Sequence, residues 1–180
     1  MPAHHKTLIH QGLGEKLEAI ARDVVDASFH VHQQLGPGLM ETVYEVVLAH
    51  ELTRRGHQVE RQKPVPIIYE NLRFEEGFRV DLIVDGLLIV ELKSVTKLKD
   101  EFRNQVRNYG RLTGLESGYL VNFPCVAGEV EVERRDVGRI EGAVGWREPE
   151  EGGEQGAGPQ ASQLRHVLGC LPRRRQRVRV

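Results

Sequence analysis

Residues 78–95 read FRVDLIVDGLLIVELKSV, and this stretch decides the fold. Its two segments, 78–84 and 87–95, are apolar almost throughout, which is typical of strands that are buried on both faces of a sheet. Between them stands Asp85-Gly86, a dipeptide that strongly favours a hairpin turn. We therefore predict two antiparallel strands near the centre of a sheet.

Three charged residues, Asp81, Glu91 and Lys93, interrupt these apolar strands. A buried carboxylate costs several kcal/mol unless a cation or a hydrogen-bonding partner compensates it. Glu91 and Lys93 are two positions apart, so their side chains leave the same face of the strand. Two carboxylates and an ammonium would then converge, and oxygen ligands of this kind suit Mg²⁺ or Mn²⁺. The alternative is an ion pair between Lys93 and one carboxylate that serves the fold alone.

The length of the turn decides whether the two carboxylates can meet. A two-residue turn at Asp85-Gly86 would place Asp81 opposite Val90, and Glu91 would then lie on the other face of the hairpin. We therefore predict one extra residue in the loop or a β-bulge nearby. A regular two-residue hairpin would exclude a shared metal site.

The remaining pattern surrounds this hairpin with helices and further strands. Apolar residues recur at helical spacing before and after Gly36-Pro37-Gly38, a sequence that breaks a helix. We predict, in chain order, helices at 18–34 and 39–55, strands at 65–69, 78–84 and 87–95, a helix at 100–113 that Asp100 caps, and strands at 117–123 and 130–134, with one more strand left open. Prolines place the first strand at an edge of the sheet, and the last strand is a short edge strand. This order predicts an α/β fold in which helices flank a mixed sheet.

The bulk composition fits one soluble domain with tails. The chain has 180 residues, 39% of them hydrophobic and 28% charged. We predict a flexible N-terminus at 1–15, a domain at 16–141, and a flexible linker with an arginine-rich tail at 142–180. The formal net charge is -1, so only a local basic cluster could attract a polyanion.

The two cysteines, Cys125 and Cys170, lie far apart and lack the CxxC spacing of a zinc or redox site. We interpret both as unpaired thiols in a reducing compartment. No long apolar run is present at the N-terminus, so we expect neither a signal peptide nor a membrane anchor. The predicted location is the cytoplasm.

Several motifs, taken in order, resemble one known family. Asp81, nine intervening residues and Glu91-Leu92-Lys93 are similar to the PD-(D/E)XK nuclease signature. GLMETVY at 38–44 matches GxxExxY, the motif for which a small bacterial family of that superfamily is named. Further similarity lies in VERQKPVPIIY at 59–69 and QVRNYGRLTGLESGYLVNF at 105–123. The chain resembles the GxxExxY family of the PD-(D/E)XK nuclease superfamily over roughly residues 18–136.

The resemblance implies a restriction-endonuclease-like αβββαβ core and Mg²⁺- or Mn²⁺-dependent cleavage of phosphodiester bonds. It implies that Asp81 and Glu91 are metal ligands, with the carbonyl of Leu92 as a further one. Lys93 would orient or help to deprotonate the attacking water and would stabilise the pentacovalent phosphate. Glu41 matches the motif's glutamate, which in the superfamily often faces the metal.

Other motif positions carry weaker implications. Gln105 and Tyr109 match the family's QxxxY, so Gln105 is expected to bond to the site carboxylates or to the substrate. Tyr44 and Tyr109 are expected to pack beside the site and to donate their hydroxyls into it. Glu45, one position after the GxxExxY tyrosine, could substitute for the motif's glutamate. Phe102 stands where many relatives have a histidine, which leaves no acid or base at that position.

A stripe of basic residues follows the third predicted helix. Arg103, Arg107 and Arg111 recur every four residues and suit either phosphate contact or a solvated helix face.

The predicted function is a Mg²⁺-dependent nuclease that acts on DNA or RNA. The alternative is a catalytically inactive module with the nuclease fold that binds nucleic acid or protein. A homodimer is possible as well.

Overall fold

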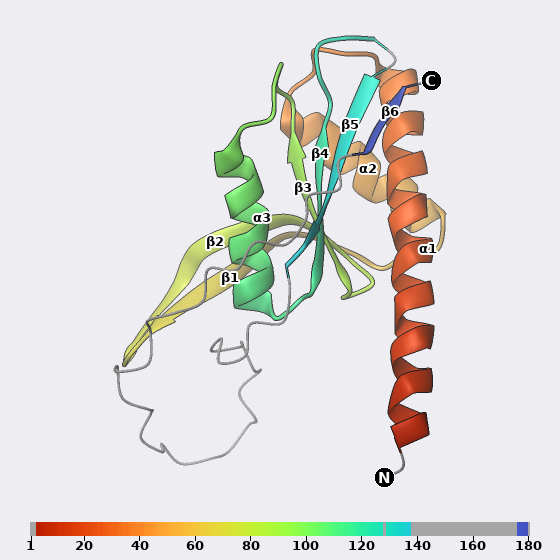
Figure 1. The fold of residues 1–180 in the computed structure, drawn as a ribbon. Coiled ribbons are helices and arrows are strands. Elements are labelled where there is room, and N and C mark those ends of the chain that lie inside the picture. The colour runs from red at the N-terminus through yellow and green to blue at the C-terminus, as the bar shows by residue number, and fades with distance from the viewer. Residues whose placement is uncertain (1–2, 128, 138–175, 180) are drawn as a thin grey trace.

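The computed structural model describes residues 3–127, 129–137 and 176–179 (Figure 1). The described residues form, in chain order, α1 (Ala3–Leu35), α2 (Glu41–Arg54), β1 (Val59–Tyr69), β2 (Leu72–Val84), β3 (Leu88–Lys93), α3 (Asp100–Thr113), β4 (Ser117–Asn122), β5 (Glu129–Asp136) and β6 (Gln176–Arg179). The order from α2 to β4 is the αβββαβ order that we predicted from the motifs.

The strands form one mixed sheet in the order β1-β2-β3-β4-β5-β6. β3 and β4 pair in parallel, and every other neighbouring pair is antiparallel. Parallel strands need a long crossover, and α3 provides it between β3 and β4. All residues of β3 and β4 are buried, as expected for strands that are covered on both faces. The proline-containing β1 lies at an edge, as predicted.

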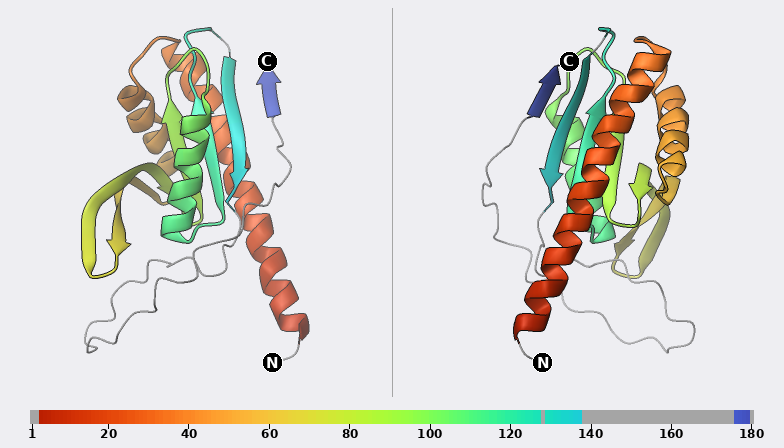
Figure 2. Two further views of the ribbon diagram at one scale, coloured as in Figure 1. Left: turned by 60° about the vertical axis from the view of Figure 1, so that its left-hand side comes forward. Right: turned by 90° about the vertical axis from the view of Figure 1, so that its right-hand side faces the viewer.

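Helices cover both faces of the sheet: α1 and α2 lie on one side and α3 on the other (Figure 2). The side chains of β3 alternate between the two sides. Leu88, Val90 and Leu92 join the apolar cluster beneath α1 and α2, whereas Ile89 joins the cluster beneath α3. By the same alternation, Glu91 and Lys93 point to the α3 side.

Several local predictions differ from the structure. β1 and β2 are longer than predicted, because each begins six residues earlier, at Val59 and Leu72. α1 begins at Ala3, well before the predicted start at residue 18. The last core strand is not at an edge, because β6, from the predicted tail, pairs with the outer side of β5. The N-cap of α3 is Lys99 and makes no side-chain capping bond, since Asp100 is already the first helical residue. Cys170 and most of the predicted linker and tail lie outside the described residues.

Helix ends and loops otherwise follow the predicted signals. α2 ends at Arg54 and α3 ends at Thr113; Gly114, the C-cap of α3, adopts the left-handed conformation common at a helix C-terminus. Among the described residues, no helix combines the length and the apolar character that a membrane span requires.

Candidate active site

The turn between β2 and β3 contains the predicted extra residue. Val84 pairs with Leu88 and Leu82 pairs with Val90, so the loop comprises the three residues 85–87. One further step along the same register brings Asp81 opposite Glu91. The irregularity that a shared site requires is therefore confirmed, and both carboxylates fall on corresponding positions of the two strands.

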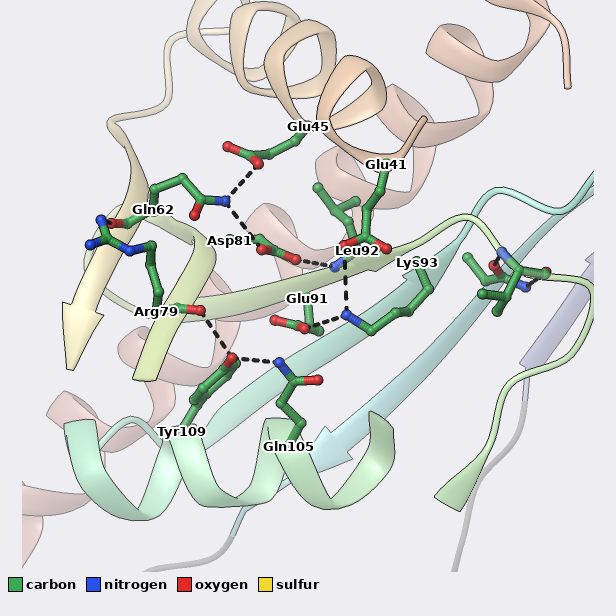
Figure 3. Close-up of polar contacts among 12 residues, drawn as sticks. Glu41, Glu45, Gln62, Arg79, Asp81, Glu91, Leu92, Lys93, Gln105 and Tyr109 are labelled. Carbon is green, nitrogen blue, oxygen red and sulfur yellow. Dashed lines mark hydrogen bonds and ion pairs between the residues drawn. The ribbon is translucent and has the colours of Figure 1, made fainter. Parts of the chain in front are cut away.

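Asp81 lies where the pairing of β2 with β3 ends. Its Oδ2 accepts a hydrogen bond of 2.8 Å from the backbone N–H of Leu92, so the carboxylate takes the place of a carbonyl in the ladder (Figure 3). The side chain is half-buried. This bond fixes the carboxylate between the two strands, next to the ELK segment.

Glu91 and Lys93 form a buried ion pair on the α3 side of β3. The distance from Nζ of Lys93 to Oε1 of Glu91 is 2.5 Å, and Glu91 is only 1% exposed. The other carboxylate oxygen, Oε2, is buried without any hydrogen-bond partner. Burial raises the pKa of Glu91 to about 8; the charge of Asp81 adds to this rise, and Lys93 opposes it.

The ammonium of Lys93 stays protonated. Burial alone would lower its pKa, but the neighbouring carboxylate of Glu91 outweighs burial, and the pKa is raised. The ammonium also lies 5.3 Å from the centroid of the Phe102 ring, within the range of a cation–π contact. Lys93 is thus a fixed positive charge rather than a base.

Glu41, in the first turn of α2, comes close to the same ammonium. Its Oε1 lies 3.8 Å from Nζ of Lys93, and the backbone N–H of Ser94 bonds to its carboxylate. The hydroxyl of Ser94 also donates to the carbonyl of Leu39 at 2.9 Å, which ties the start of α2 to the end of β3. Partial burial raises the pKa of Glu41, and Lys93 opposes this rise. The structure therefore brings Glu41 together with the hairpin residues.

Tyr44 does not point into this group, which corrects our expectation for its hydroxyl. The hydroxyl donates to the carbonyl of Gly36 at 2.7 Å, and the ring stacks on Phe123 with centroids 4.3 Å apart. Gly36 and Gly38 adopt φ angles of 73° and 85°, which favour glycine. The tyrosine of GxxExxY therefore holds the glycine loop in front of α2 and positions Glu41 only indirectly.

Glu45 and Gln62 form a second polar link that the sequence did not reveal. Oε1 of Glu45 accepts from Nε of Arg61 at 3.0 Å, and Oε2 accepts from Nε2 of Gln62 at 2.6 Å. Both oxygens are thus occupied, which argues against Glu45 as a substitute for Glu41. The same amide of Gln62 donates to Oδ1 of Asp81 at 3.3 Å (Figure 3). The pairing of β1 with β2 places Gln62 opposite Asp81, and this register is the signal that could have indicated it.

Gln105 and Tyr109 face the sheet from α3 but bond to each other. Nε2 of Gln105 donates to the Tyr109 hydroxyl at 2.6 Å, and that hydroxyl donates to the carbonyl of Arg79 at 2.9 Å. Gln105 thus bonds to Tyr109 rather than to a site carboxylate, and its contact with a substrate stays a prediction. Burial, and then the charge of Glu91, raise the pKa of Tyr109, so its hydroxyl stays protonated.

The arginine stripe of α3 divides into different environments. Arg103 forms a bidentate pair with the buried Glu133, with two contacts of 2.8 Å, and also donates to Asp100. Its geometry is that of a structural ion pair rather than of a phosphate contact. Arg107 and Arg111 are exposed, and for them phosphate binding stays a prediction.

The residues present fit a cation that binds two carboxylates. Within the described part of the chain, no three side chains of His, Cys, Asp or Glu are grouped so as to hold a metal ion. Any such ion would therefore need the carbonyl of Leu92 or water beside Asp81 and Glu91. The unpartnered Oε2 of Glu91 is the observation that favours a cation, since a buried oxygen without a partner is costly.

A mixed sheet with an αβββαβ order, and an Asp, a Glu and a Lys at the end of its central hairpin, defines a restriction-endonuclease-like domain. The family model described as the PD-(D/E)XK nuclease superfamily matches residues 18–135. The match covers well over half of the 180 residues, and the chain belongs to this superfamily. The comparison with curated proteins found no match, and neither did the comparison with solved structures.

Proposed function

We propose that this protein hydrolyses phosphodiester bonds of nucleic acid with the help of Mg²⁺ or Mn²⁺. The observation that carries the proposal is the unpartnered, buried Oε2 of Glu91, which lies in the same group as Asp81 and the protonated Lys93. An apolar sheet would gain nothing from an oxygen without a partner. A ligand for a hard cation accounts for it.

Each residue has a role that its surroundings support. Asp81, Glu91 and the carbonyl of Leu92 would hold the ion, which when bound lowers the pKa of water and neutralises charge on a phosphate. Lys93 would place its ammonium against the phosphate oxygens that become more negative during cleavage. Glu41 reaches the same ammonium from α2, at 3.8 Å, and would help to hold it in place.

The proposal also covers the family within the superfamily, the kind of nucleic acid and the location of the protein. GLMETVY at 38–44 supports the GxxExxY family within the superfamily. The chemistry of the site suits DNA and RNA equally, because both present the same phosphodiester. A cytoplasmic location agrees with the exposed free thiol of Cys125.

The test is cleavage of labelled DNA and RNA, single-stranded and duplex, with Mg²⁺, with Mn²⁺ and with EDTA. We expect Glu91→Ala and Lys93→Ala each to lower the rate about 100-fold or more, because each removes charge that acts on the reacting phosphate. Lys97→Ala, an exposed lysine outside the group, is the matched control. Circular dichroism verifies folding. Cleavage that survives both site variants, or that persists in EDTA, would contradict the proposal.

One observation favours the alternative of an inactive binding module. Lys93 contacts Glu91 at 2.5 Å, and burial raises the pKa of Glu91, so in the absence of metal this buried pair could simply be part of the fold. Calorimetry separates the two functions. Nucleic-acid binding in EDTA, without any uptake of Mg²⁺ or Mn²⁺, would favour the binding module.

A further inference from the structure

Arg79 lies on β2, two positions before Asp81, and its side chain is exposed. An extended strand rises about 3.3 Å per residue, so the two Cα atoms are about 6.6 Å apart. A strand of a duplex rises about 3.4 Å per nucleotide. A phosphate at Arg79 and a phosphodiester at Asp81 would therefore be one or two nucleotides apart.

The guanidinium of Arg79 is held by backbone rather than by acid. Its Nη1 donates to the carbonyl of Gln62 at 3.1 Å, and its own carbonyl accepts from the Tyr109 hydroxyl. Within the part of the chain that the structure describes, no carboxylate pairs with this guanidinium. Neighbouring arginines differ, since Arg61 pairs with Glu45. The positive charge of Arg79 is therefore available to a ligand.

An unusual backbone conformation provides the carbonyl that holds Arg79. Gln62 has a φ of 50° although it is not glycine, a conformation that costs free energy in a strand. Its carbonyl meets Arg79, and its side-chain amide meets Asp81 and Glu45 (Figure 3). One residue thus fixes both a metal-site carboxylate and the neighbouring guanidinium.

The acidic residues around the site call for a cation that can attract a polyanionic substrate. The acids around the hairpin are Glu41, Glu45, Asp81 and Glu91. A polyanion that approaches them is repelled unless cations face it, and Lys93 is largely buried. An exposed arginine that bonds to one backbone carbonyl and to no acid keeps N–H groups of its planar fork for a phosphate.

We propose that Arg79, oriented by the carbonyl of Gln62, binds a backbone phosphate that neighbours the phosphodiester at Asp81. The ligand is the sugar–phosphate backbone of DNA or RNA, without regard to base. The inference rests on the proposed function for its substrate, but binding can be measured without cleavage.

The experiment measures binding of the full-length protein to a short DNA duplex and to its RNA counterpart in EDTA. Fluorescence anisotropy is recorded at several NaCl concentrations between about 50 and 200 mM. We expect Arg79→Gln to flatten the plot of log affinity against log salt by about one unit of slope, and to weaken binding about eightfold near 0.1 M salt. Arg79→Lys keeps the charge and should keep the slope.

Arg54→Gln is the matched control. Arg54 is an exposed arginine that pairs with Glu51 at the far end of α2 from Glu41, about 20 Å along the helix. We expect its slope to equal that of the unchanged protein. Circular dichroism should show both variants folded, because both side chains are exposed and the carbonyl of residue 79 still accepts from the Tyr109 hydroxyl.

The outcomes separate this inference from the proposed function. A lower slope for Arg79→Gln alone supports the phosphate site, even if no variant cleaves with Mn²⁺. A protein that cleaves with Mn²⁺ while Arg79→Gln keeps its full slope overturns the phosphate site and leaves hydrolysis standing. Equal losses in Arg79→Gln and Arg54→Gln would also overturn it, because they would reflect general charge alone.

Discussion

The burial of Glu91 makes Glu91→Gln the most informative single substitution. Glu91 is 1% exposed, and burial raises its pKa from 4.5 to about 8. A carboxyl group with a raised pKa binds its proton more tightly in the folded chain than in the unfolded one. The contribution of Glu91 to the free energy of unfolding is therefore highest below pH 4.5 and decreases as the pH rises through about 8.

The size of the effect follows from the same shift. Each pKa unit corresponds to about 1.4 kcal/mol, so the change from 4.5 to about 8 sets an upper limit near 5 kcal/mol. Structural relaxation around the charge lowers the effect, and we expect roughly 2 to 5 kcal/mol. Glutamine carries no charge at any pH. In EDTA, Glu91→Gln should therefore be more stable than the unchanged protein by this amount at pH 9, and about equal to it at pH 4.

A second buried glutamate provides a control of opposite sign. Glu133 is 2% exposed, but its hydrogen bonds with Arg103 lower its pKa, with a further contribution from Arg135. The charged form of Glu133 therefore stabilises the fold above its unfolded pKa, and that stability is lost as the pH falls through the folded pKa. Glu133→Gln should be destabilising at pH 7, with a penalty that shrinks at low pH.

Urea unfolding, followed by circular dichroism at pH 4, 6 and 9, measures both variants. The reasoning fails if Glu91→Gln is no more stable than the unchanged protein at pH 9, or if the two variants share one pH dependence. If Glu91→Gln is more stable at pH 9, it should also have lost cleavage, so that stability and activity would be opposed at this residue.

Two further predictions concern the residues that hold the fold around the site. Tyr44→Phe removes the hydroxyl bond to Gly36, and we expect the free energy of unfolding to fall by about 1 kcal/mol, together with slower cleavage at unchanged metal affinity; an unaltered rate would contradict the positioning role. His57 bonds to Asp85 at 2.9 Å and to Asp23 at 3.0 Å; burial alone would lower its pKa, but these aspartates raise it. The contribution of protonated His57 to the free energy of unfolding is present below its unfolded pKa and is lost as the pH rises through its folded pKa. His57→Gln should therefore lower the free energy of unfolding by about 1 to 2 kcal/mol at pH 5.5 and by much less at pH 9. An equal loss at both pH values would refute the charge-based account.

Signals from residues close in sequence were enough to predict most of the fold. The apolar strands, the Asp85-Gly86 turn and the helix over 100–113 depend on residues that are close in sequence, and the structure has all three. The extra loop residue was also predictable, because two buried carboxylates cannot share a site unless the register allows it. The group of Asp81, Glu91 and Lys93 therefore followed from the sequence.

Contacts between distant segments could not be predicted in this way. The partner of Arg103 is Glu133, thirty residues away on β5, and only the packing of α3 against the sheet brings them together. The role of Gln62 depends on its positive φ, which its residue type disfavours. The hydroxyl of Tyr44 turns toward Gly36 because the glycine loop folds back on α2, a path that the motif does not specify.

The three-residue loop at 85–87 has a consequence for mutational tolerance. Because side chains alternate strictly along a strand, sliding β3 by one residue against β2 would place Glu91 opposite Leu82, in the apolar cluster beneath α1 and α2, and would separate it from Asp81. Substitutions at 85–87 that keep Val84 paired with Leu88 should therefore be tolerated far better than changes that slide this pairing by one residue, so that the register set by the loop, more than the identity of its residues, is what a functional site demands.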